Sequence, residues 1–356
     1  MRYAVIMAGG AGVRLWPLSR KSRPKQLLHL FSGTSLLRQS YERVARMLPA
    51  EQIYIITAEE HLPAVSRELP ELPEANLLGE PVGRDTANAV GLSAAVLAER
   101  DPDAVIGMFT ADHIITPPDR FCDAVERGFR IAEGEPGVLV TLGIRPTRPD
   151  TNYGYVHRGQ RYADGSFEVR KFTEKPDLST AQAYVSSGEY YWNSGMFAWR
   201  SGTILDQLAR HLAGSHDAIR RIAAVWDTPD RPRTLNTLYP TLTKISIDFA
   251  VMEHADHVRV VELDCDWVDV GSFPALAGVV PADEDGNVST SREVVHLRSR
   301  GTVVVSEEAH LIATLGVEDL VVVHSPDATL ICHKKDASSI KELLEKVRSQ
   351  YGETYS

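Results

Sequence analysis

The chain has 356 residues, 43% of them hydrophobic, and a formal net charge of −10. This length exceeds a typical single domain, so two domains with a sizeable core are expected. The acidic balance argues against a nucleic-acid partner, and no apolar run approaches the length needed to span a membrane. The N-terminus lacks a secretory signal pattern, so a soluble cytoplasmic protein is expected. Cys122, Cys265 and Cys332 form no C-x-x-C pair and are interpreted as small buried residues.

A glycine-rich loop follows the first predicted strand. The apolar run 3–7 predicts a buried strand, and it leads directly into Ala8-Gly9-Gly10-Ala11-Gly12-Val13-Arg14. Glycines lack a Cβ, so the backbone can approach a phosphate and direct several N–H groups at it. Several cations lie close together in this part of the chain, among them Arg14, Arg20, Arg23 and Lys25. The loop is therefore interpreted as a polyphosphate-binding element.

Two familiar nucleotide-binding motifs do not fit this loop. A dinucleotide fingerprint would need a third glycine where Leu15 stands, and a P-loop would need its lysine directly after the last glycine, whereas Lys25 lies far beyond it. A glycine-rich turn without a ligand is the simpler alternative. A turn alone, however, does not require a cluster of nearby cations.

The chain up to residue 142 alternates between predicted strands and helices. Helices are predicted over 34–48, 59–69, 86–100 and 121–132, with Thr86 as the N-cap of the third. Buried strands are predicted over 53–57, 77–79, 104–109 and 138–142. This alternation predicts an α/β fold with a doubly wound, mostly parallel sheet. Ligands bind such sheets beyond the carboxyl ends of the strands, where Glu80 and Asp112 also lie.

The middle of the chain is less regular. Polar or glycine-bearing turns beside aromatic residues are predicted at 152–155, 172–176 and 192–197, as in a pocket for a small polar ligand. Helices are predicted over 202–211 and 217–226, and a strand over 258–261. Asp269 follows this last strand and is expected at its end.

Near residue 281 the pattern changes to short strands. They are predicted over 294–297, 302–305, 311–314, 320–323 and 328–331, with no helix between them. Such close spacing favours a small β-solenoid, with a small sandwich as the alternative. A final helix with Asp336 as N-cap is expected to dock through Ile340, Leu343, Leu344 and Val347.

In their order along the chain, these motifs resemble those of the sugar-1-phosphate nucleotidyltransferases, and most closely those of the bacterial mannose-1-phosphate guanylyltransferases. The resemblance covers nearly all of the first 275 residues, through motifs at 9–26, 80–87, 111–113, 152–155, 172–176, 192–197, 247–253 and 267–272. A single motif would be weak support, but an ordered set is specific. The resemblance implies a Rossmann-like, GT-A-like catalytic domain over 1–281. It also implies a left-handed β-helix-like solenoid domain with a terminal helix over 282–356.

The resemblance also implies a reaction and a set of site residues. GMP would pass from GTP to α-D-mannose 1-phosphate, giving GDP-mannose and pyrophosphate by in-line attack on the α-phosphorus. Asp112 and Asp269 would bind one Mg²⁺, and Arg14 and Lys25 would complete the catalytic set. Besides Arg14, Lys25 and Asp112, the implied nucleotide contacts are Ala8, Gly9, Gly10, Gly12, Val13, Glu80, Gly83, Thr86 and Ala87. The implied sugar-phosphate contacts are Gly154, Glu174, Lys175, Asn193 and Asp269.

Glu80 is expected to determine which nucleotide base is bound. Guanine presents N1–H and N2–H₂ as adjacent donors, which one carboxylate accepts together, whereas uracil or thymine prefers an amide. Two alternatives remain: a sister transferase that makes UDP-, dTDP- or CDP-sugars, and a non-catalytic sugar-nucleotide-binding regulatory subunit. The presence of Lys25, Asp112 and Asp269 favours an active enzyme.

Some roles stay open at this point. Arg20 and Arg23 are either a second layer of phosphate contacts or surface charges, and His113 either orients the site or packs in the core. Family members usually carry Asn-Thr-Ala-Pro where this chain has Asp85-Thr86-Ala87-Asn88, which bears on base contacts from this loop. Many bacterial relatives also carry an isomerase domain, for which this chain is too short, so no isomerase activity is expected. The β-rich tail and final helix are expected to form a homodimer interface.

Overall fold

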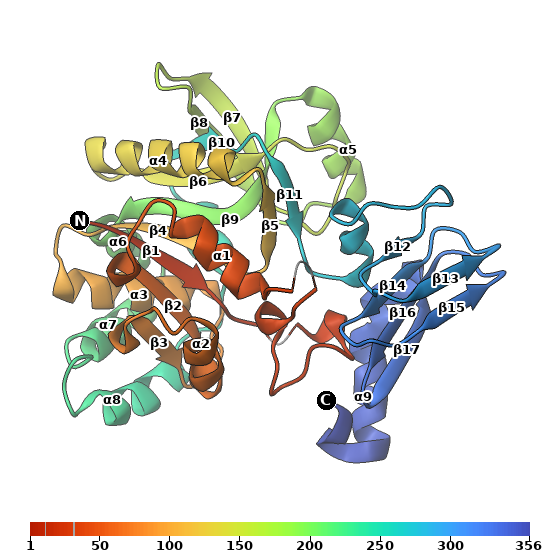
Figure 1. Ribbon diagram of the computed structural model, residues 1–356. Coiled ribbons are helices and arrows are strands. Elements are labelled where there is room, and N and C mark those ends of the chain that lie inside the picture. The colour runs from red at the N-terminus through yellow and green to blue at the C-terminus, as the bar shows by residue number, and fades with distance from the viewer. Residues whose placement is uncertain (11, 31–32) are drawn as a thin grey trace. The chain divides into compact units, whose positions relative to one another are not determined.

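A computed structural model describes residues 1–10, 12–30 and 33–356 (Figure 1). These residues form two compact units, and each unit is assembled from three stretches of chain. The first unit contains Met1–Met7, Glu42–Thr110 and Ile115–Asp266. The second contains Ala8–Tyr41, Ala111–Ile114 and Trp267–Ser356. Ala11 of the predicted phosphate loop lies outside the described residues.

The first unit is built on a nine-stranded sheet with the order β3-β2-β1-β4-β9-β6-β10-β8-β7. Its strands are β1 (Arg2–Met7), β2 (Ile53–Ala58), β3 (Leu77–Glu80), β4 (Val105–Thr110), β6 (Leu139–Ile144), β7 (Tyr155–Arg161), β8 (Phe167–Thr173), β9 (Tyr190–Arg200) and β10 (Val258–Glu262). Strand β1 pairs in parallel with β2 and β4, and β2 pairs in parallel with β3. Strand β9 runs antiparallel to β4 and β6. The predicted doubly wound, mostly parallel α/β sheet is confirmed.

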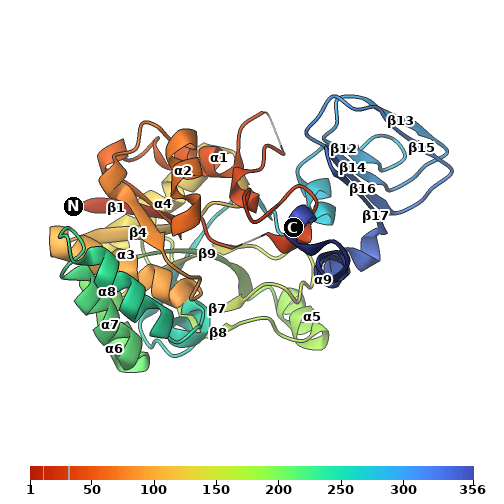
Figure 2. The same ribbon diagram turned by 90° about the horizontal axis from the view of Figure 1, so that it is seen from below.

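Helices cover both faces of this sheet, as Figures 1 and 2 show. Helix α4 (Pro118–Gly134) lies on one face, and α3 (Thr86–Arg100), α6 (Ser201–His211) and α7 (Ala213–Ala223) lie on the other. The unit also contains α2 (Leu62–Glu68), α5 (Leu178–Ser187) and α8 (Arg231–Leu238). Helix α1 (Leu36–Val44) belongs to both units. Among the described residues, no helix has the length and apolar character needed to cross a membrane.

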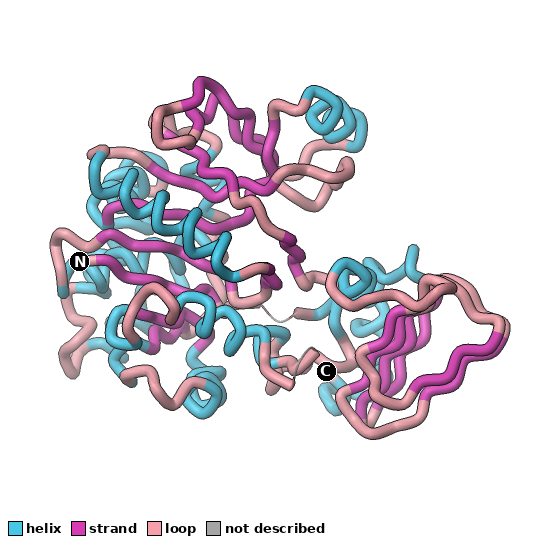
Figure 3. The backbone as a smooth tube through the Cα atoms, turned by 45° about the horizontal axis from the view of Figure 1, so that its top comes forward, coloured by secondary structure: helices cyan, strands magenta, loops and turns pink. Residues whose placement is uncertain are grey.

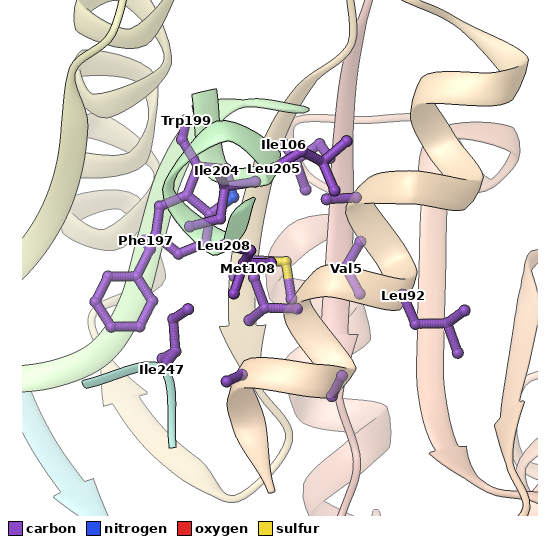
Figure 4. Close-up of a cluster of buried hydrophobic side chains, with 14 of the residues drawn as sticks. Val5, Leu92, Ile106, Met108, Phe197, Trp199, Ile204, Leu205, Leu208 and Ile247 are labelled. Atoms are coloured by element: carbon purple, nitrogen blue, oxygen red, sulfur yellow. The ribbon is translucent and has the colours of Figure 1, made fainter. Parts of the chain in front are cut away.

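The main core of the first unit lies between the sheet and the layer of α3, α6 and α7 (Figure 4). Successive side chains of a strand point to opposite faces, so Ile106 and Met108 of β4 face the same layer. They meet Trp199 of β9 and Leu205 and Leu208 of α6, each at most 6% exposed. Burial of this apolar surface contributes roughly 25 cal/mol per Å², and it fixes the strands whose ends carry predicted site residues.

The second unit contains the predicted β-solenoid, visible as stacked strands in Figure 3. Its strands are β12 (Val288–Ser289), β13 (Val294–Leu297), β14 (Val303–Ser306), β15 (Ile312–Leu315), β16 (Leu320–Ser325) and β17 (Ala328–His333). Val294 pairs in parallel with Ile312, and Val303 with Val321, a spacing of 18 residues in both cases. A constant spacing between parallel strands defines the coils of a solenoid. The solenoid is confirmed, and the sandwich alternative, which stacks antiparallel sheets, is wrong.

The segment after the glycine-rich loop packs on the solenoid within the second unit. Leu15, Trp16 and Leu18 share one apolar cluster with the inward-facing valines of β14 and β16. The final helix, α9 (Ile340–Tyr351), joins this cluster through Ile340 and Leu344. The indole Nε1 of Trp16 donates to the carbonyl oxygen of Tyr355 at 2.5 Å. The solenoid and α9 therefore support the chain that carries the predicted phosphate-binding residues.

Several predicted boundaries are wrong for identifiable reasons. Helix α3 is capped by Asp85, whose carboxylate accepts from the Thr86 backbone N–H at 2.8 Å, and not by Thr86. Asp336 does not cap α9, because 334–339 form a 3₁₀ helix and α9 begins at Ile340. Leu343 of the predicted docking stripe is 40% exposed.

The turn predicted at 192–197 lies inside β9. Gly195 has φ +69°, and the pairing of β9 with β6 shifts register nearby. A β-bulge therefore accounts for the turn-like glycine within a continuous strand. The predicted helix 34–48 shortens to α1, the helix 217–226 begins earlier as α7, and α5 and α8 were not predicted.

Candidate active site

Two side-chain hydrogen bonds hold the described part of the glycine-rich loop in place. The side-chain amide of Gln26 donates to the carbonyl oxygen of Ala8 at 2.6 Å, and the Ser19 hydroxyl donates to that of Gly12 at 2.7 Å. Gly12 has φ +60°, and a Cβ there would lie 2.5 Å from Cβ of Lys25. The sequence pattern identified the glycines but assigned no role to Ser19 or Gln26.

The second unit brings Lys25, Asp112 and Asp269 together. The ammonium group of Lys25 forms an ion pair with Asp112. Asp112 lies between β4 and the short strand β5 (His113–Thr116), and Asp269 ends β11 (Asp266–Asp269), which pairs with β5. The backbone N–H of Val270 donates to the carbonyl oxygen of Asp112 at 3.0 Å. This short pairing explains how two aspartates far apart in sequence meet.

Burial and mutual charge set different pKa values for these three groups. Burial lowers the pKa of Lys25, but Asp112 and Asp269 outweigh it, so the pKa is raised. Burial raises the pKa of Asp112, but the charge and hydrogen bond of Lys25 act in the opposite direction, and this pKa is lowered. The pKa of Asp269 is raised by burial and by the charge of Asp112. The cluster therefore carries an ion pair and a second carboxylate that a bound cation would stabilise.

Asp112, Asp269 and His113 could hold a metal ion, because one ligand atom from each lies within 4.8 Å of the others. The indole Nε1–H of Trp267 donates to Nδ1 of His113 at 3.1 Å. An indole N–H only donates, so the proton of a neutral His113 ring lies on Nε2. His113 then presents an N–H group, and the two carboxylates supply the metal ligands. Such a donor set fits a hard divalent cation.

The three arginines near the loop have different surroundings. Arg14 is exposed, and its Nη2 lies 3.3 Å from the position that a Cβ on Gly271 would take, beside Asp269. Arg20 forms an ion pair with Asp327 at 2.7 Å and lies over the Trp16 ring. Arg23 donates to Glu307 at 2.9 Å. Arg20 and Arg23 are therefore bound to the solenoid, and Arg14 is the arginine beside the aspartates.

Glu80 lies at the end of β3 in the first unit and is 7% exposed. Its Oε1 accepts a hydrogen bond of 2.5 Å from the hydroxyl of Tyr239. Burial raises the pKa of Glu80, although the Tyr239 hydrogen bond acts in the opposite direction. Sequence reasoning missed Tyr239, because no motif or spacing connects it with Glu80.

The loop after Glu80 is bound to residues 245–247. The backbone N–H of Ala87 donates to the carbonyl oxygen of Ile245 at 3.2 Å. The Thr86 hydroxyl accepts from the backbone N–H of Ile247 at 2.9 Å. Gly83 is exposed, whereas Ala87 is fully buried. Whether Gly83, Thr86 and Ala87 contact a nucleotide stays a prediction.

The predicted sugar-phosphate residues of the first unit form one group. The Glu174 carboxylate occupies the space that a Cβ at Gly154 would need, so a larger residue there would displace Glu174. The Lys175 ammonium donates to Glu174 Oε1 at 2.7 Å and is 58% exposed. Asn193 joins the group because its backbone N–H donates to the carbonyl oxygen of Gly154 at 2.8 Å. Their contacts with a sugar phosphate stay predictions.

Asp248 is a half-buried carboxyl group that sequence reasoning did not select. It begins a π-helical turn, Asp248–Met252, and its Oδ1 accepts from the side-chain amide of Asn193 at 2.9 Å. The side-chain amide oxygen of Asn193, Oδ1, accepts from the Thr141 hydroxyl at 3.0 Å. Burial and the nearby charge of Glu174 raise the pKa of Asp248 to about 7. The motif at 247–253 contained this residue, but a lone aspartate gave no sign of burial.

We expect Asp248→Asn to flatten the pH dependence of stability. Because the folded pKa is raised, Asp248 stabilises the fold below about pH 4, and this contribution is lost as pH rises through 7. The free energy of unfolding of the unmodified protein should fall by about 2–4 kcal/mol over this range. Asn still accepts from Asn193 and carries no charge. Urea denaturation between pH 5 and pH 8 measures how the free energy of unfolding changes with pH. The control is Asp256→Asn, since Asp256 is exposed. If the free energies of Asp248→Asn and of the unmodified protein change in parallel with pH, the prediction is contradicted.

Residues 3–286 match the sequence model of the family described as Nucleotidyl transferase. The chain belongs to this family. Residues 292–347 of this nucleotidyl transferase match a second family, the MannoseP isomerase/GMP-like beta-helix domain, in agreement with the solenoid.

Similar proteins match this nucleotidyl transferase over its full length. A mannose-1-phosphate guanylyltransferase of Klebsiella pneumoniae is 39% identical over 100% of this chain and 76% of its own length. One from Escherichia coli K12 is 38% identical over 98% of this chain and 73% of its own. A crystal structure from Thermus thermophilus, described as mannose-1-phosphate geranyltransferase, has a TM-score of 0.88 at 38% identity. The match covers 98% of this chain and 99% of the Thermus chain.

Proposed function

We propose that the protein transfers GMP from GTP to α-D-mannose 1-phosphate, releasing pyrophosphate and GDP-mannose. The observation that carries the proposal is the meeting of Lys25, Asp112 and Asp269 behind a glycine-rich loop in a nucleotidyl transferase. The choice of GTP and mannose 1-phosphate is supported by two relatives named mannose-1-phosphate guanylyltransferase. They are 38–39% identical to this chain over nearly its whole length. The enzyme is a mannose-1-phosphate guanylyltransferase.

The reaction needs positioning and charge neutralisation rather than a general base. A phosphate monoester is largely dianionic near neutral pH, so its oxygen can attack the α-phosphorus directly. Lys25 carries its charge beside Asp112, and Arg14 offers a planar guanidinium suited to the departing pyrophosphate. We propose Mg²⁺ as the cation held by Asp112 and Asp269. When bound, it supplies positive charge at the phosphates.

Pyrophosphate release tests the proposed function. The protein is incubated with Mg²⁺ and each combination of GTP, UTP, dTTP or CTP with mannose 1-phosphate or glucose 1-phosphate. Release with GTP and mannose 1-phosphate supports the proposal, and a preference for another nucleotide would identify a sister transferase. No release with any combination would favour a non-catalytic binding protein. Omission of Mg²⁺ should abolish release.

Glu80→Gln is expected to weaken the use of GTP far more than that of UTP. The amide NH₂ of Gln faces one guanine donor, so one hydrogen bond is replaced by a repulsion between donors. Hydrogen bonds to a charged group contribute about 1.5–3 kcal/mol, so kcat/KM for GTP should fall roughly 10–100-fold. Steady-state kinetics with both nucleotides measure this, with exposed Glu74→Gln as control. An unchanged ratio of GTP to UTP would remove Glu80 from base recognition.

We also propose a cytoplasmic homodimer with a domain boundary between residues 281 and 282. The exposed apolar side chains Val295, Leu297 and Leu315 of the solenoid support an interface with a second copy. Sedimentation velocity at micromolar concentration tests this, and a monomer would contradict it.

A further inference from the structure

Tyr239 is a buried tyrosine whose hydroxyl donates a hydrogen bond to Glu80. Its side chain is 0% exposed and comes from a short 3₁₀ helix, Tyr239–Thr241, that follows α8. The hydroxyl donates to Oε1 of Glu80 at 2.5 Å. A buried hydroxyl without a hydrogen bond costs about 1–3 kcal/mol in proteins, so Tyr239 and Glu80 hold each other in place.

We propose that Tyr239 is a specificity-determining residue that positions the Glu80 carboxylate for guanine. The inference rests on the proposed role of Glu80 and extends it to a residue that acts through Glu80. A free glutamate has several rotamers to lose on binding, whereas the Tyr239 hydroxyl holds the carboxylate before the nucleotide arrives. Such preorganisation raises affinity by reducing the entropy lost on binding.

The hydrogen-bonding capacity of the carboxylate permits both partners at once. An ionised carboxylate offers about four lone-pair sites on its two oxygens. Tyr239 uses one site on Oε1, and guanine N1–H and N2–H₂ require two. The phenol therefore orients Glu80 without displacing the base.

The chain around Tyr239 is fixed to the loop after Glu80. Arg84 donates to the carbonyl oxygen of Pro240, and the Asn88 side-chain amide donates to that of Thr243 at 2.8 Å. The hydrogen bonds of Thr86 and Ala87 with residues 245–247 connect the same two segments. The bond from Asn88 to Thr243 therefore adds a further link between α3 and the segment that follows Tyr239.

Tyr239→Phe tests the inference, because it removes the hydroxyl and keeps the ring. We expect KM for GTP to rise about 10-fold, while kcat stays within about threefold of its value in the unmodified protein. The GTP-to-UTP ratio of kcat/KM should fall by about 10-fold as well. This size corresponds to the loss of one hydrogen bond to a charged group. Both nucleotides are measured on the same preparation, so a reduced folded fraction cancels in the ratio. A loss shared equally by GTP and UTP, or an unchanged ratio, would overturn the inference.

A double-mutant cycle shows whether Tyr239 acts through Glu80. In the Glu80→Gln background, Tyr239→Phe should change the GTP-to-UTP ratio less than twofold, and a full additional effect would contradict action through Glu80. Tyr54→Phe is the matched control, since Tyr54 is a buried phenol whose oxygen accepts from Arg100 at 3.2 Å. If Glu80→Gln leaves the ratio unchanged, the proposed role of Glu80 fails. If Glu80→Gln lowers the ratio and Tyr239→Phe does not, only this inference fails.

Discussion

Asp269→Asn is expected to reduce transferase activity strongly and to stabilise the metal-free protein. The pKa of Asp269 is raised by burial and by Asp112. Asp269 therefore favours folding below its unfolded pKa, and this contribution is lost as pH rises through the folded pKa. Near pH 8 the ionised carboxylate destabilises the fold, and Asn removes that charge. The same substitution removes one of the two oxygen ligands proposed for the cation.

The two effects of Asp269→Asn are measured separately. Turnover with GTP, mannose 1-phosphate and Mg²⁺ should fall by about 10²–10³-fold, comparable to the loss of one preorganised electrostatic group. The Tm in EDTA at pH 8 should rise above that of the unmodified protein. Asp266→Asn is the control, since Asp266 is an exposed residue of the same strand. Retained activity would remove Asp269 from the metal site, and a lower Tm in EDTA would contradict the electrostatic argument.

Hydrophobic periodicity was sufficient to predict most of the fold. The apolar runs of β1, β2 and β4 are buried on both faces and read clearly as parallel strands. The short strands after residue 294 revealed the solenoid, because closely spaced strands with no helix between them are typical of stacked coils. In both regions the local pattern and the tertiary environment favour the same structure.

Features that depend on tertiary contacts could not be predicted from local sequence. Thr86 has the side chain of an N-cap, yet its hydroxyl accepts from the backbone N–H of Ile247, and Asp85 caps α3 instead. The chain 8–41 folds with the solenoid rather than with β1, from which it emerges. Neither outcome appears in hydrophobic spacing, because each depends on partners more than 150 residues away.

The candidate site also contains residues that could be predicted from local sequence and residues that could not. Asp112, Asp269 and Lys25 were predicted from motifs, and β5 and β11 bring the two aspartates together. Tyr239 and Asp248 were missed, since the importance of each comes from a hydrogen bond shielded by the fold, to Glu80 and Asn193 respectively. Burial of a polar group makes such a bond energetically important, and burial is a property of the folded chain.

Gly12→Ala is expected to reduce activity by at least about 10²-fold in a protein that still folds. Gly12 has φ +60°, which costs an alanine roughly 1 kcal/mol. The added Cβ would lie 2.5 Å from Cβ of Lys25 and 3.3 Å from its Cα, so Lys25 must shift from its present position beside Asp112. A displacement of about 1 Å at a reacting centre can cost 10²-fold in rate.

The expected signature of Gly12→Ala is a loss of kcat with only a small change in Tm. A shift of Lys25 weakens charge neutralisation at the phosphates, whereas the apolar cluster of Leu15, Trp16 and Leu18 behind the loop stays buried. Gly202→Ala is the control, because Gly202 lies in the first turn of α6, and a Cβ there has open space among the described residues. Alanine at 202 should leave kcat unchanged and stabilise the helix by about 0.5–1 kcal/mol. Full activity of Gly12→Ala would show that Lys25 does not need its present position against the loop.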